Sequence, residues 1–457
     1  MTKKLHVHFV GIGGIGMSAL ARWFLAKNWA VSGSDLADSE ILKELRKEGV
    51  KVKIGHKKSN LPAHLLEPKA KPTSMVIYSS AIKPDNPELR EARKFGIKPM
   101  SYAETIGCLT KPYKTIAVAG SHGKSTTTSL LGLIVIRAGM NPTIIVGTKL
   151  KELRGKNFLS GKSNVLVLEA DEWKAAFLHY SPFIAIVTNI DREHLDFYKD
   201  LNAVKKSFLQ FLKNTKPEGF LVLNRDDRNV RSLSPEIKKI ATQNNLRVIW
   251  FSIQEDKALV REIKKIINIP GEHNVSNALA ACTVAIRCLG IKKAVALKTI
   301  GAYRGAWRRF EYKGKYDGAL IFDDYAHHPT EIKATLKAFK EKYPKKKLLC
   351  VFQPHQAKRL QALFREFQDS FSDADEVLIF PSYQVAGRDE PSSRFNARAL
   401  VAAIQKRHPH KLIFYLANPR DLKKKIHTLP SPLRSKVIVM MGAGDIVSHT
   451  SSLLRRP

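Results

Sequence analysis

Cysteine is scarce in this sequence, which has four thiols in 457 residues. None of them forms a C-x-x-C pair, so the sequence offers neither the ligand spacing of a zinc site nor a disulfide framework. We expect isolated thiols in a reducing compartment, which predicts a cytoplasmic location. The four are Cys108, Cys282, Cys288 and Cys350.

Long apolar runs are also missing. The richest stretch, 130–146, is interrupted by Arg137, Asn141 and Pro142. It therefore falls short of the roughly 18 apolar residues that a membrane-spanning helix needs. The first residues lack the hydrophobic segment of a signal peptide. We expect no insertion into a membrane.

Acidic residues are outnumbered almost two to one. The sequence has 41 Asp and Glu residues against 77 Lys and Arg residues, a net charge of +36. Such a charge favours polyanions, including nucleic acid and anionic lipid surfaces. The cations are spread along the whole chain, however, and no aromatic-interleaved RNA motif accompanies them. We interpret most of them as a solvated surface that also attracts a diphosphate-bearing substrate, and we do not expect nucleic acid as a partner.

Strand-like and helix-like segments alternate through the chain, which is typical of parallel sheets covered by helices. The length fits three domains. We predict an α/β protein with domains at 1–111, 112–300 and 301–457. Helices are expected near 14–27, 125–137 and 275–289. The predicted strands are 5–10, 30–32, 51–54, 75–79, 115–119, 165–169, 184–189, 220–223, 319–322, 348–352, 377–380, 412–415 and 437–440.

A glycine-rich turn follows the first predicted strand. Residues 8–17, HFVGIGGIGM, contain G-x-G-x-x-G, and Asp35 follows about 20 residues later. Glycines let the backbone approach a diphosphate at a helix N-terminus. Alone, this motif favours NAD or FAD without deciding which nucleotide binds, and a turn without a ligand is the alternative.

A second glycine turn, AGSHGKST at 119–126, stands between another predicted strand and helix. Its amides would cradle phosphate oxygens, Lys124 would neutralise the β and γ phosphates, and the Ser125 hydroxyl would coordinate Mg²⁺. The turn is shorter than a full Walker A motif, because Val118 stands where the first glycine belongs.

Polar residues follow two further strands of the same domain. Glu169-Ala-Asp171-Glu172 places carboxylates at a strand end, where a phosphate-bound Mg²⁺ is expected, although a solvated acidic turn is an equal alternative. In TNIDREHLD, residues 188–196, His194 becomes a plausible metal ligand beside such a site. In GEHNVSNALAA, residues 271–281, polar residues lead into an Ala-rich helix, and the alternative to a functional role for them is helix capping by Asn274 or Ser276.

The third domain carries its polar groups at strand-to-helix turns, where α/β sites form. Individually these are ordinary turns; together they supply cations, two carboxylates and imidazoles. They are Arg304, Arg308 and Arg309, DDYAHHPT at 323–330, FQPH at 352–355 and GAGD at 442–445.

Taken in order, these motifs resemble the Mur ligases. HFVGIGGIGMSALA, SGSD, SSAI, GSHGKSTTT, LEADE, VTNIDREHLD, GEHNVSNALAA, WRRFE, FDDYAHHPTE, FQPH and MGAGD span nearly the entire chain. The resemblance implies an N-terminal Rossmann-like domain that binds UDP, a central P-loop ATPase domain and a C-terminal Rossmann-like domain. It reassigns the first glycine turn from a dinucleotide to the UDP end of a substrate.

The resemblance is strongest to the members that add L-alanine. It implies that ATP phosphorylates the carboxylate of UDP-N-acetylmuramate, and that L-alanine attacks the acyl phosphate, in peptidoglycan precursor synthesis. Catalysis would then be positioning and charge neutralisation. We expect a monomer or weak homodimer with ATP and Mg²⁺ as cofactors.

The resemblance assigns residues to each part of this site. UDP would contact Gly11, Gly13, Gly14, Gly16, Asp35 and Ser80. ATP would contact Gly120, Ser121, His122, Gly123, Lys124, Ser125, Thr126, His273, Asn274 and Asn277, with Arg309 and Asp324 from across a domain cleft. Mg²⁺ would contact Ser125, Glu169 and His194. The substrate side would hold Tyr325, His327 and Arg359, with His327 orienting or deprotonating the amine, and the catalytic set is Lys124, His194, His327 and Arg359.

The sequence departs from the family pattern at several places. Ser121 and Ser125 replace two threonines but keep the hydroxyls. Trp173-Lys174 replaces Ser-Asp, which puts local substrate contacts in doubt. Gln356 replaces an arginine, so one anion contact is missing or is taken over by Lys358 or Arg359. A carbamylated lysine occurs in some members, and Lys205 and Lys206 are its candidates here.

Three other functions stay open. A ligase of the same family that attaches a preformed murein tripeptide would need a wider amino-acid pocket. A nucleic-acid-stimulated P-loop ATPase would fit the charge of +36 and predicts turnover that rises with RNA or DNA and falls with salt. A UDP-sugar-binding protein without activity is disfavoured by Lys124, Glu169 and His194.

Overall fold

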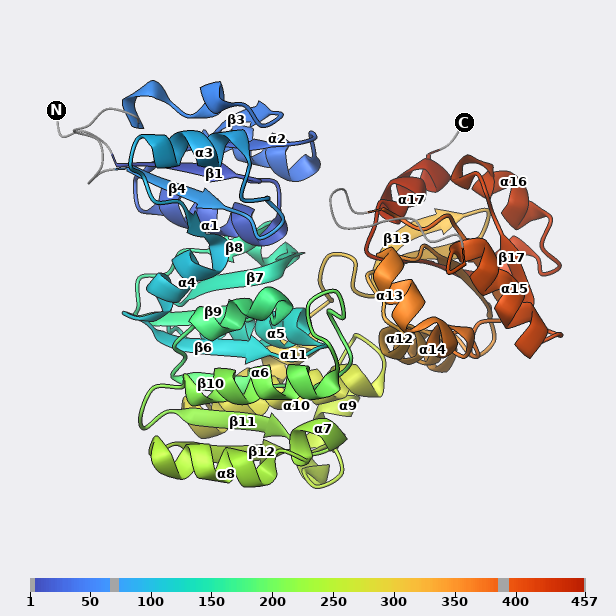
Figure 1. Ribbon diagram of the computed structural model, residues 1–457. Coiled ribbons are helices and arrows are strands. Elements are labelled where there is room, and N and C mark those ends of the chain that lie inside the picture. The colour runs from blue at the N-terminus through green and yellow to red at the C-terminus, as the bar shows by residue number, and fades with distance from the viewer. Residues whose placement is uncertain (1–4, 66–73, 385–393, 456–457) are drawn as a thin grey trace. The chain divides into compact units, whose positions relative to one another are not determined.

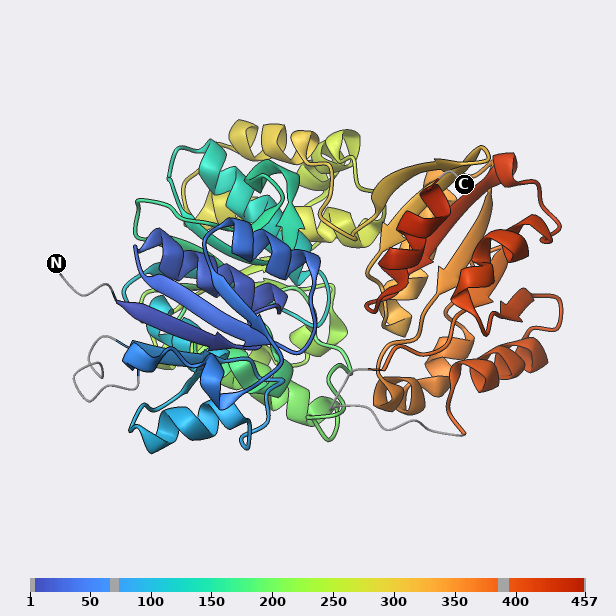
Figure 2. The same cartoon turned by 90° about the horizontal axis from the view of Figure 1, so that it is seen from above.

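The computed structural model describes residues 5–65, 74–384 and 394–455. The chain divides into two compact units (Figures 1 and 2). The first consists of Met1–Asp191, Leu201–Lys257 and Ala278–Thr299. The second consists of Arg192–Asp200, Ala258–Asn277 and Ile300–Pro457. In the described residues, no helix has the length and apolar character needed to cross a membrane.

The first sheet is parallel and has the order β3-β2-β1-β4-β5. Every residue of β1 is buried, which explains its apolar sequence with inward-facing histidines. The strand order reverses beside β1, so the turn after β1 lies at a topological switch point, where α/β sheets bind ligands. The elements are β1 His6–Val10, α1 Ile15–Ala26, β2 Ala30–Asp35, α2 Glu40–Lys47, β3 Lys51–Ile54, β4 Ser74–Tyr78, α3 Pro87–Lys94, β5 Met100–Ser101 and α4 Tyr102–Thr110.

The second sheet has seven strands in the order β12-β11-β10-β6-β9-β7-β8. Strand β6 is central, and the turn that follows it leads into the buried helix α5. Only the β7–β8 pair is antiparallel. The strands are β6 Lys114–Ala119, β7 Thr143–Leu150, β8 Lys156–Leu159, β9 Val165–Glu169, β10 Ile184–Val187, β11 Phe220–Asn224 and β12 Arg247–Phe251. The longer helices are α5 Lys124–Arg137, α6 Leu201–Lys213, α8 Ser234–Gln243, α9 Lys257–Ile266, α10 Glu272–Thr283 and α11 Lys293–Ala302.

Helix α1 of the first sheet packs on β7 and β8 of the second, which joins two predicted domains into one unit (Figure 1). At the centre of this contact the Arg22 guanidinium donates to Asn157 Oδ1 over 2.6 Å. The Asn157 amide donates to Ser18 Oγ, and Arg22 also bonds the carboxylate of Glu48. Because Arg22 and Asn157 are buried, their polar groups are satisfied only while both sheets stay in place.

The third sheet belongs to the second unit and has the order β13-β14-β18-β15-β16-β17. All its pairs are parallel except β13–β14. One face is covered by α12 to α15 and the other by α16 and α17, each over its own apolar cluster. The strands are β13 Glu311–Tyr316, β14 Ala319–Asp324, β15 Lys347–Phe352, β16 Glu376–Ile379, β17 Leu412–Tyr415 and β18 Lys436–Met441. The helices are α12 Pro329–Lys342, α13 Ala357–Ala362, α14 Phe364–Gln368, α15 Ala397–Arg407, α16 Leu422–His427 and α17 Ile446–Leu454.

The predicted fold class is confirmed, with one sheet inside each predicted domain; the domain boundaries themselves stay predictions. Two details differ. The second and third sheets each have an antiparallel pair at one edge, which the alternating pattern does not reveal. Helix capping by Asn274 or Ser276 is wrong, because α10 already begins at Glu272 and both residues lie inside it.

Candidate active site

The turn after β6 is shaped by two glycines with positive φ. Gly120 has φ 140° and Gly123 has φ 82°. A Cβ at Gly120 would lie 1.9 Å from Thr188 Oγ1, so no side chain fits there. Gly123 precedes α5 in the left-handed region and provides no side-chain cap, which leaves the first amides of the helix to an outside acceptor. Such an amide cluster suits a phosphate.

The same turn is locked onto the end of β10. The amides of Ser121 and His122 donate to the backbone and side-chain oxygens of Asn189, over 3.1 and 2.8 Å. Thr188 Oγ1 donates to the His122 carbonyl, and His122 Nε2 lies 2.9 Å from Asp191 Oδ2. The first residues of the TNIDREHLD motif therefore hold the phosphate turn in one conformation.

Lys124 is held above this turn by a buried carboxylate. Its Nζ lies 2.8 Å from Glu172 Oε2 and donates to the Gly120 carbonyl over 2.6 Å. Burial alone would lower the pKa of Lys124, but the charges of Glu172 and Asp171 raise it above its ordinary value. Glu172 is fully buried and was not among the predicted site residues. The ammonium is thus charged and close to the amides, in position to neutralise a phosphate.

Ser125 and Glu169 form an oxygen cluster at the start of α5. Ser125 Oγ donates to Glu169 Oε1 over 2.9 Å. The other carboxylate oxygen accepts the Gly147 amide over 2.7 Å, and a Cβ at Gly147 would collide with it. A hydroxyl and a carboxylate are oxygen donors of the kind that Mg²⁺ prefers, so these residues fit the predicted metal.

The turn after β1 uses the same backbone device with a different closure. Gly11 has φ 81°, and Gly14 precedes α1 without a side-chain cap. Asp35 accepts the Gly13 amide over 2.7 Å and the Leu36 amide over 2.8 Å. Its carboxylate thus fixes the turn; that UDP binds there stays a prediction.

A buried polar network that the sequence analysis missed supports this turn from below. Glu88 accepts hydrogen bonds from Ser34 and Asn60 and lies 2.7 Å from His8 Nε2 and 3.2 Å from His56 Nδ1. Burial alone would raise the pKa of Glu88, but these partners lower it to about 2. The network ties β1, β2 and α3 together directly beneath the glycine turn.

Two side chains connect the first predicted domain with the central one within the first unit. A Cβ at Gly16 would lie 2.9 Å from the Tyr102 ring, and burial with the charges of Glu169 and Asp171 raises the Tyr102 pKa. Lys174, in the left-handed region with φ 50°, donates through Nζ to the Ser80 carbonyl over 2.7 Å. The Trp173-Lys174 departure therefore connects the central domain to a predicted UDP-binding loop.

In the second unit, His327 stands in a buried polar setting. Its Nδ1 lies 2.9 Å from the Tyr325 carbonyl, which can only accept, so in this bond Nδ1 carries the hydrogen. Nδ1 also lies 3.3 Å from Glu331. Burial lowers the pKa of His327 to about 4, so the ring is neutral at pH 7. Its Nε2 then offers a lone pair.

The arginines and the carboxylate of the predicted ATP contact have defined partners in the same unit. Asp324 accepts the amides of Phe310 and Ala326, and burial raises its pKa. The Arg309 guanidinium lies 5.0 Å from the centre of the Tyr325 ring. Arg308 is buried and donates to the carbonyls of Gly442 and Gly444, which joins the WRRFE and MGAGD motifs.

Arg359 and Glu193 form a buried ion pair in the second unit. The Nη2 to Oε2 distance is 3.0 Å, and 7% of the arginine and 4% of the glutamate side chain are exposed. Burial alone would raise the pKa of Glu193, but Arg359 holds it well below its ordinary value. Gln356, which replaces the family's arginine, precedes α13 with φ 67°. Glu193 was missed because its partner is 166 residues away.

The predicted residues thus fall into two sets. The first unit holds the residues predicted to contact UDP, the phosphate turn through Thr126, and Glu169. The second unit holds His194, His273, Asn274, Asn277, Arg309, Asp324, Tyr325, His327 and Arg359. Their joint action in one site stays a prediction. Of the candidates for modification, Lys205 bonds Ser232 Oγ over 2.9 Å.

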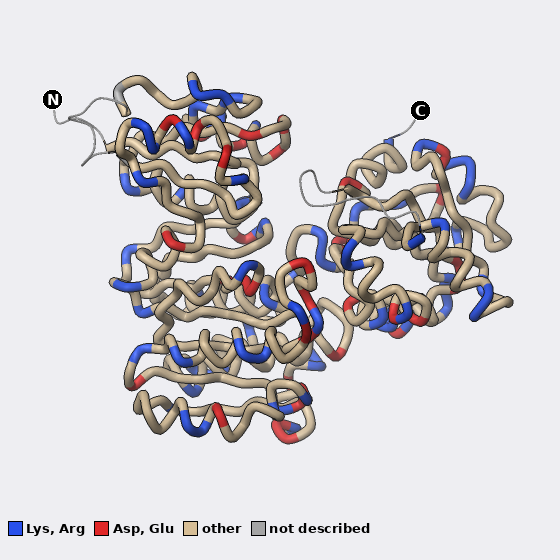
Figure 3. The backbone as a smooth tube through the Cα atoms, in the orientation of Figure 1, with Lys and Arg blue, Asp and Glu red and all other residues tan. Residues whose placement is uncertain are grey.

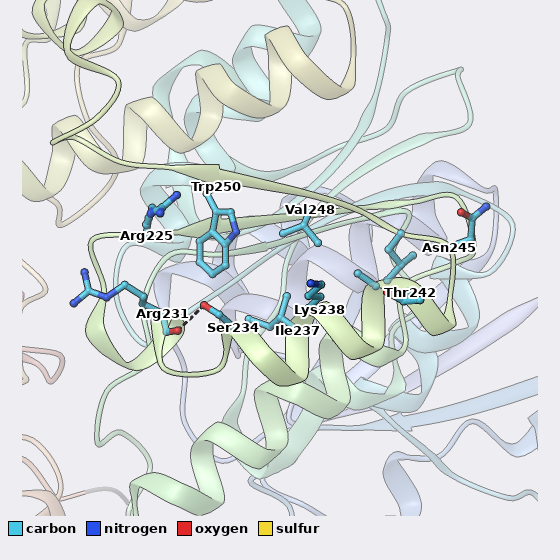
Figure 4. A pocket seen from close by; sticks show the side chains of 11 residues that line it. Arg225, Arg231, Ser234, Ile237, Lys238, Thr242, Asn245, Val248 and Trp250 are labelled. Atoms are coloured by element: carbon cyan, nitrogen blue, oxygen red, sulfur yellow. Dashed lines mark hydrogen bonds between the residues drawn. The ribbon is translucent and has the colours of Figure 1, made fainter.

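A cavity of about 650 Å³ lies outside these sets, between α8 and β12 (Figure 4). Arg225, Arg231 and Lys238 line it together with Ile237 and Trp250. Figure 3 shows Lys and Arg scattered over both units. With 77 such residues in the chain, three cations at one cavity are what composition alone supplies. We assign the cavity no ligand.

Comparison with known proteins gives three family matches along the chain. They are the "Mur ligase family, catalytic domain" over residues 6–114, the "Mur ligase middle domain" over 118–285 and the "Mur ligase, glutamate ligase domain" over 308–444. The matches follow the order of the three sheets.

Curated relatives match over nearly the full length. UDP-N-acetylmuramate–L-alanine ligase of Alkaliphilus metalliredigens is 39% identical, with 98% of this chain and 97% of that protein covered. The protein of the same name from Clostridium botulinum strain Okra is 37% identical, with 97% and 96% covered. Among solved structures, UDP-N-acetylmuramate–alanine ligase of Thermotoga maritima has a TM-score of 0.77 at 24% identity, with 98% of both chains covered. That structural likeness supports the three-domain fold.

Proposed function

The chain belongs to the Mur ligase family, and from that premise we propose that it joins L-alanine to the carboxylate of UDP-N-acetylmuramate with hydrolysis of ATP. The full-length likeness to enzymes of that name supports this activity. The observation that carries it is the cluster at the start of α5, where Lys124, Ser125, Glu169 and Glu172 surround a phosphate-binding turn. A UDP-binding protein without activity has no use for such a cluster.

The reaction needs activation because a carboxylate is a poor acyl donor. Transfer of a phosphoryl group from ATP to the carboxylate gives an acyl phosphate, whose leaving group is phosphate instead of hydroxide. Attack by the alanine amine then forms the amide bond and releases phosphate. Catalysis is mainly positioning and charge neutralisation. The turn amides and the Lys124 ammonium supply donors at the transferred phosphoryl group.

The amine must reach the acyl phosphate without its extra proton. His327 is neutral at pH 7, because burial lowers its pKa to about 4. An efficient general base has a pKa close to the operating pH, and the pKa of His327 lies well below that pH. His327 would therefore orient the amine through its lone pair, and the extra proton would leave to solvent or phosphate.

The predicted metal would be held by Ser125 and Glu169 together with His194. When bound, Mg²⁺ would neutralise negative charge on the ATP phosphates and so support transfer of the terminal phosphoryl group. A hydroxyl, a carboxylate and an imidazole are suitable donors for it. Ser125 Oγ already lies 2.9 Å from Glu169 Oε1, so the chain itself holds these two ligands together.

An amino-acid panel tests this function. The purified chain is incubated with ATP, Mg²⁺ and UDP-N-acetylmuramate plus L-alanine, glycine, L-serine or the tripeptide L-Ala-D-Glu-diaminopimelate, and phosphate release is recorded. We expect L-alanine to give the highest kcat/KM, and omission of either UDP-N-acetylmuramate or the amino acid to stop release. Faster turnover with the tripeptide would replace this proposal with a recycling ligase. Stimulation by RNA without either substrate would replace it with a nucleic-acid-dependent ATPase.

A further inference from the structure

The segment Arg192–Asp200 belongs to a different unit from the residues that flank it. Asp191 before it and Leu201 after it lie in the first unit, whereas the segment itself is part of the second. Its family match falls within the middle domain, residues 118–285. The segment forms neither helix nor strand, so side chains must fix its position. It carries His194, the histidine assigned to the metal.

The most buried of the ion pairs that hold this segment joins Glu193 and Arg359. Arg359 projects from α13, and its Nη2 lies 3.0 Å from Glu193 Oε2. The same carboxylate oxygen accepts the backbone amide of His194 over 3.2 Å. Arg359 also donates to the His355 carbonyl over 3.3 Å. One carboxylate therefore joins the helix α13 to the backbone of the histidine.

Further contacts with the second unit surround this pair. The Arg192 guanidinium lies 3.0 Å from Glu366 Oε1 on α14. His328 Nε2 lies 3.3 Å from the Arg192 carbonyl. Leu195 packs against the apolar cluster of the third sheet. Asp191, the last residue of the first unit before the segment, donates its amide to Ser121 Oγ over 2.8 Å. The change of unit falls between Asp191 and Arg192.

We propose that Glu193 and Arg359 form a latch that fixes the segment Arg192–Asp200, and with it His194, to the body of the third sheet. Arg359 is then a positioning residue that acts through Glu193, in place of the substrate contact that the resemblance implies. A motion of the second unit carries His194 with it. The part of this inference that concerns metal use rests on the proposed function, whereas the latch itself does not.

Hydrogen exchange on the full-length chain without metal or nucleotide tests the latch directly. In Arg359→Met, we expect peptides that cover 192–200 to exchange about tenfold faster, because local opening no longer breaks the pair. Peptides of the phosphate turn, 119–128, should keep their rate. Glu193→Gln should give the same pattern. In the double variant, the increase should not exceed that of the larger single one, because both act on one contact.

Two controls keep the test decisive. Arg192→Gln removes an ion pair of the same segment whose partners are 44% and 43% exposed, and it should change exchange less than twofold. Arg359→Lys keeps the buried charge, so it covers the case in which Arg359→Met does not fold. It should give a smaller rise in exchange of the same segment.

Kinetics then separate positioning from substrate contact. For Arg359→Met we expect the KM for Mg²⁺ to rise about tenfold, while the KM for L-alanine and the Kd for UDP-N-acetylmuramate stay within twofold. A raised KM for L-alanine with unchanged exchange of 192–200 would overturn the latch. Loss of ligation in the unmodified chain with the expected exchange pattern would reject the proposed function and leave the latch intact.

Discussion

The two glycine turns of this protein use one backbone device for two purposes. Each follows a central strand, β1 or β6, and each begins with a glycine of positive φ, Gly11 or Gly120. Each also leads into a helix whose first amides have no side-chain cap. The first turn is closed by Asp35, which accepts its amides, whereas the second carries Lys124 above its amides. Under the proposed function, the backbone of each turn would bind a phosphate, and the adjacent side chain, Asp35 or Lys124, would decide whether that phosphate is held or transferred.

The two turns also differ in what fixes them. The first rests on a buried network around Glu88, which belongs to the same sheet. The second is tied to Asn189 and Asp191 at the end of a neighbouring strand. The side chains that fix the first turn thus come from its own sheet, whereas those that fix the second turn come from the motif that follows the neighbouring strand β10.

Removing the lysine should produce the largest separation between the turns. In Lys124→Ala we expect phosphate release to fall by roughly 10³-fold, because the charge that neutralises the transferred group is gone. The Kd for UDP-N-acetylmuramate should stay within twofold, since the first turn is untouched. Calorimetric titration and phosphate release measure the two quantities. Lys162→Ala, an exposed lysine of the same domain, is the matched control. Equal loss of both functions would show that the turns are not separate sites.

A methyl group in the first turn should do the reverse. In Gly13→Ala the new Cβ would lie 2.9 Å from Asp35 Oδ2, so the carboxylate can no longer hold the turn. We expect the Kd for UDP-N-acetylmuramate to rise by about 10- to 100-fold, which is the loss of one or two charge-assisted contacts. ADP binding should be unchanged. Gly14→Ala meets its nearest atom at 3.7 Å and should keep the melting temperature of the unmodified protein. Weaker ADP binding in Gly13→Ala would contradict the comparison.

The two turns should fail at opposite ends of the pH scale. The folded-state pKa of Glu88 is lowered to about 2, so its stabilisation is complete above pH 4.5 and is lost as the pH falls from there toward 2. The pKa of Lys124 is raised, so its contribution is complete below pH 10.5 and is lost only as the pH rises above that value. Hydrogen exchange of 5–65 and of 119–128 over this range measures both. In Glu88→Gln the acid-side dependence of 5–65 should flatten, and an unchanged slope would reject the assignment.

The smallest effect is expected at the metal-side hydroxyl of the second turn. Ser125→Thr keeps the oxygen that donates to Glu169, so the KM for Mg²⁺ and kcat should change by less than about threefold. Ser125→Ala removes that oxygen and should raise the KM for Mg²⁺ by about tenfold. A titration of Mg²⁺ against phosphate release distinguishes them. If both variants behave alike, the hydroxyl is not a ligand.

Local pattern was sufficient to predict both glycine turns and most of the strands, but β5, β7, β8, β12 and β13 were not predicted. Strand β9 follows from an apolar run that ends on Glu169, and both glycine turns follow from their spacing. Strand β7 was missed because Gly147 interrupts it, and that glycine is required by the close carboxylate of Glu169. What breaks local pattern here is therefore a contact with the site.

Long-range partners account for the rest of what sequence could not reveal. Lys124 and Glu172 are 48 residues apart, and His8 and Glu88 are 80 residues apart. Nothing in the spacing of a single sequence pairs such residues. The same holds for Glu193, whose neighbour His194 was recognised by its motif while its own role depends on α13.

The contact of α1 with β7 and β8 gives the protein a built-in measure of length. Arg22 of the helix that follows the first turn and Asn157 of β8 hold the two sheets together within the first unit, and with them the spacing between the two glycine turns. A molecule anchored by its diphosphate at the first turn can offer its acid to the second only if its sugar spans that interval. Under the proposed function, the distance between the two turns therefore restricts which acids can react, independently of the amino-acid pocket.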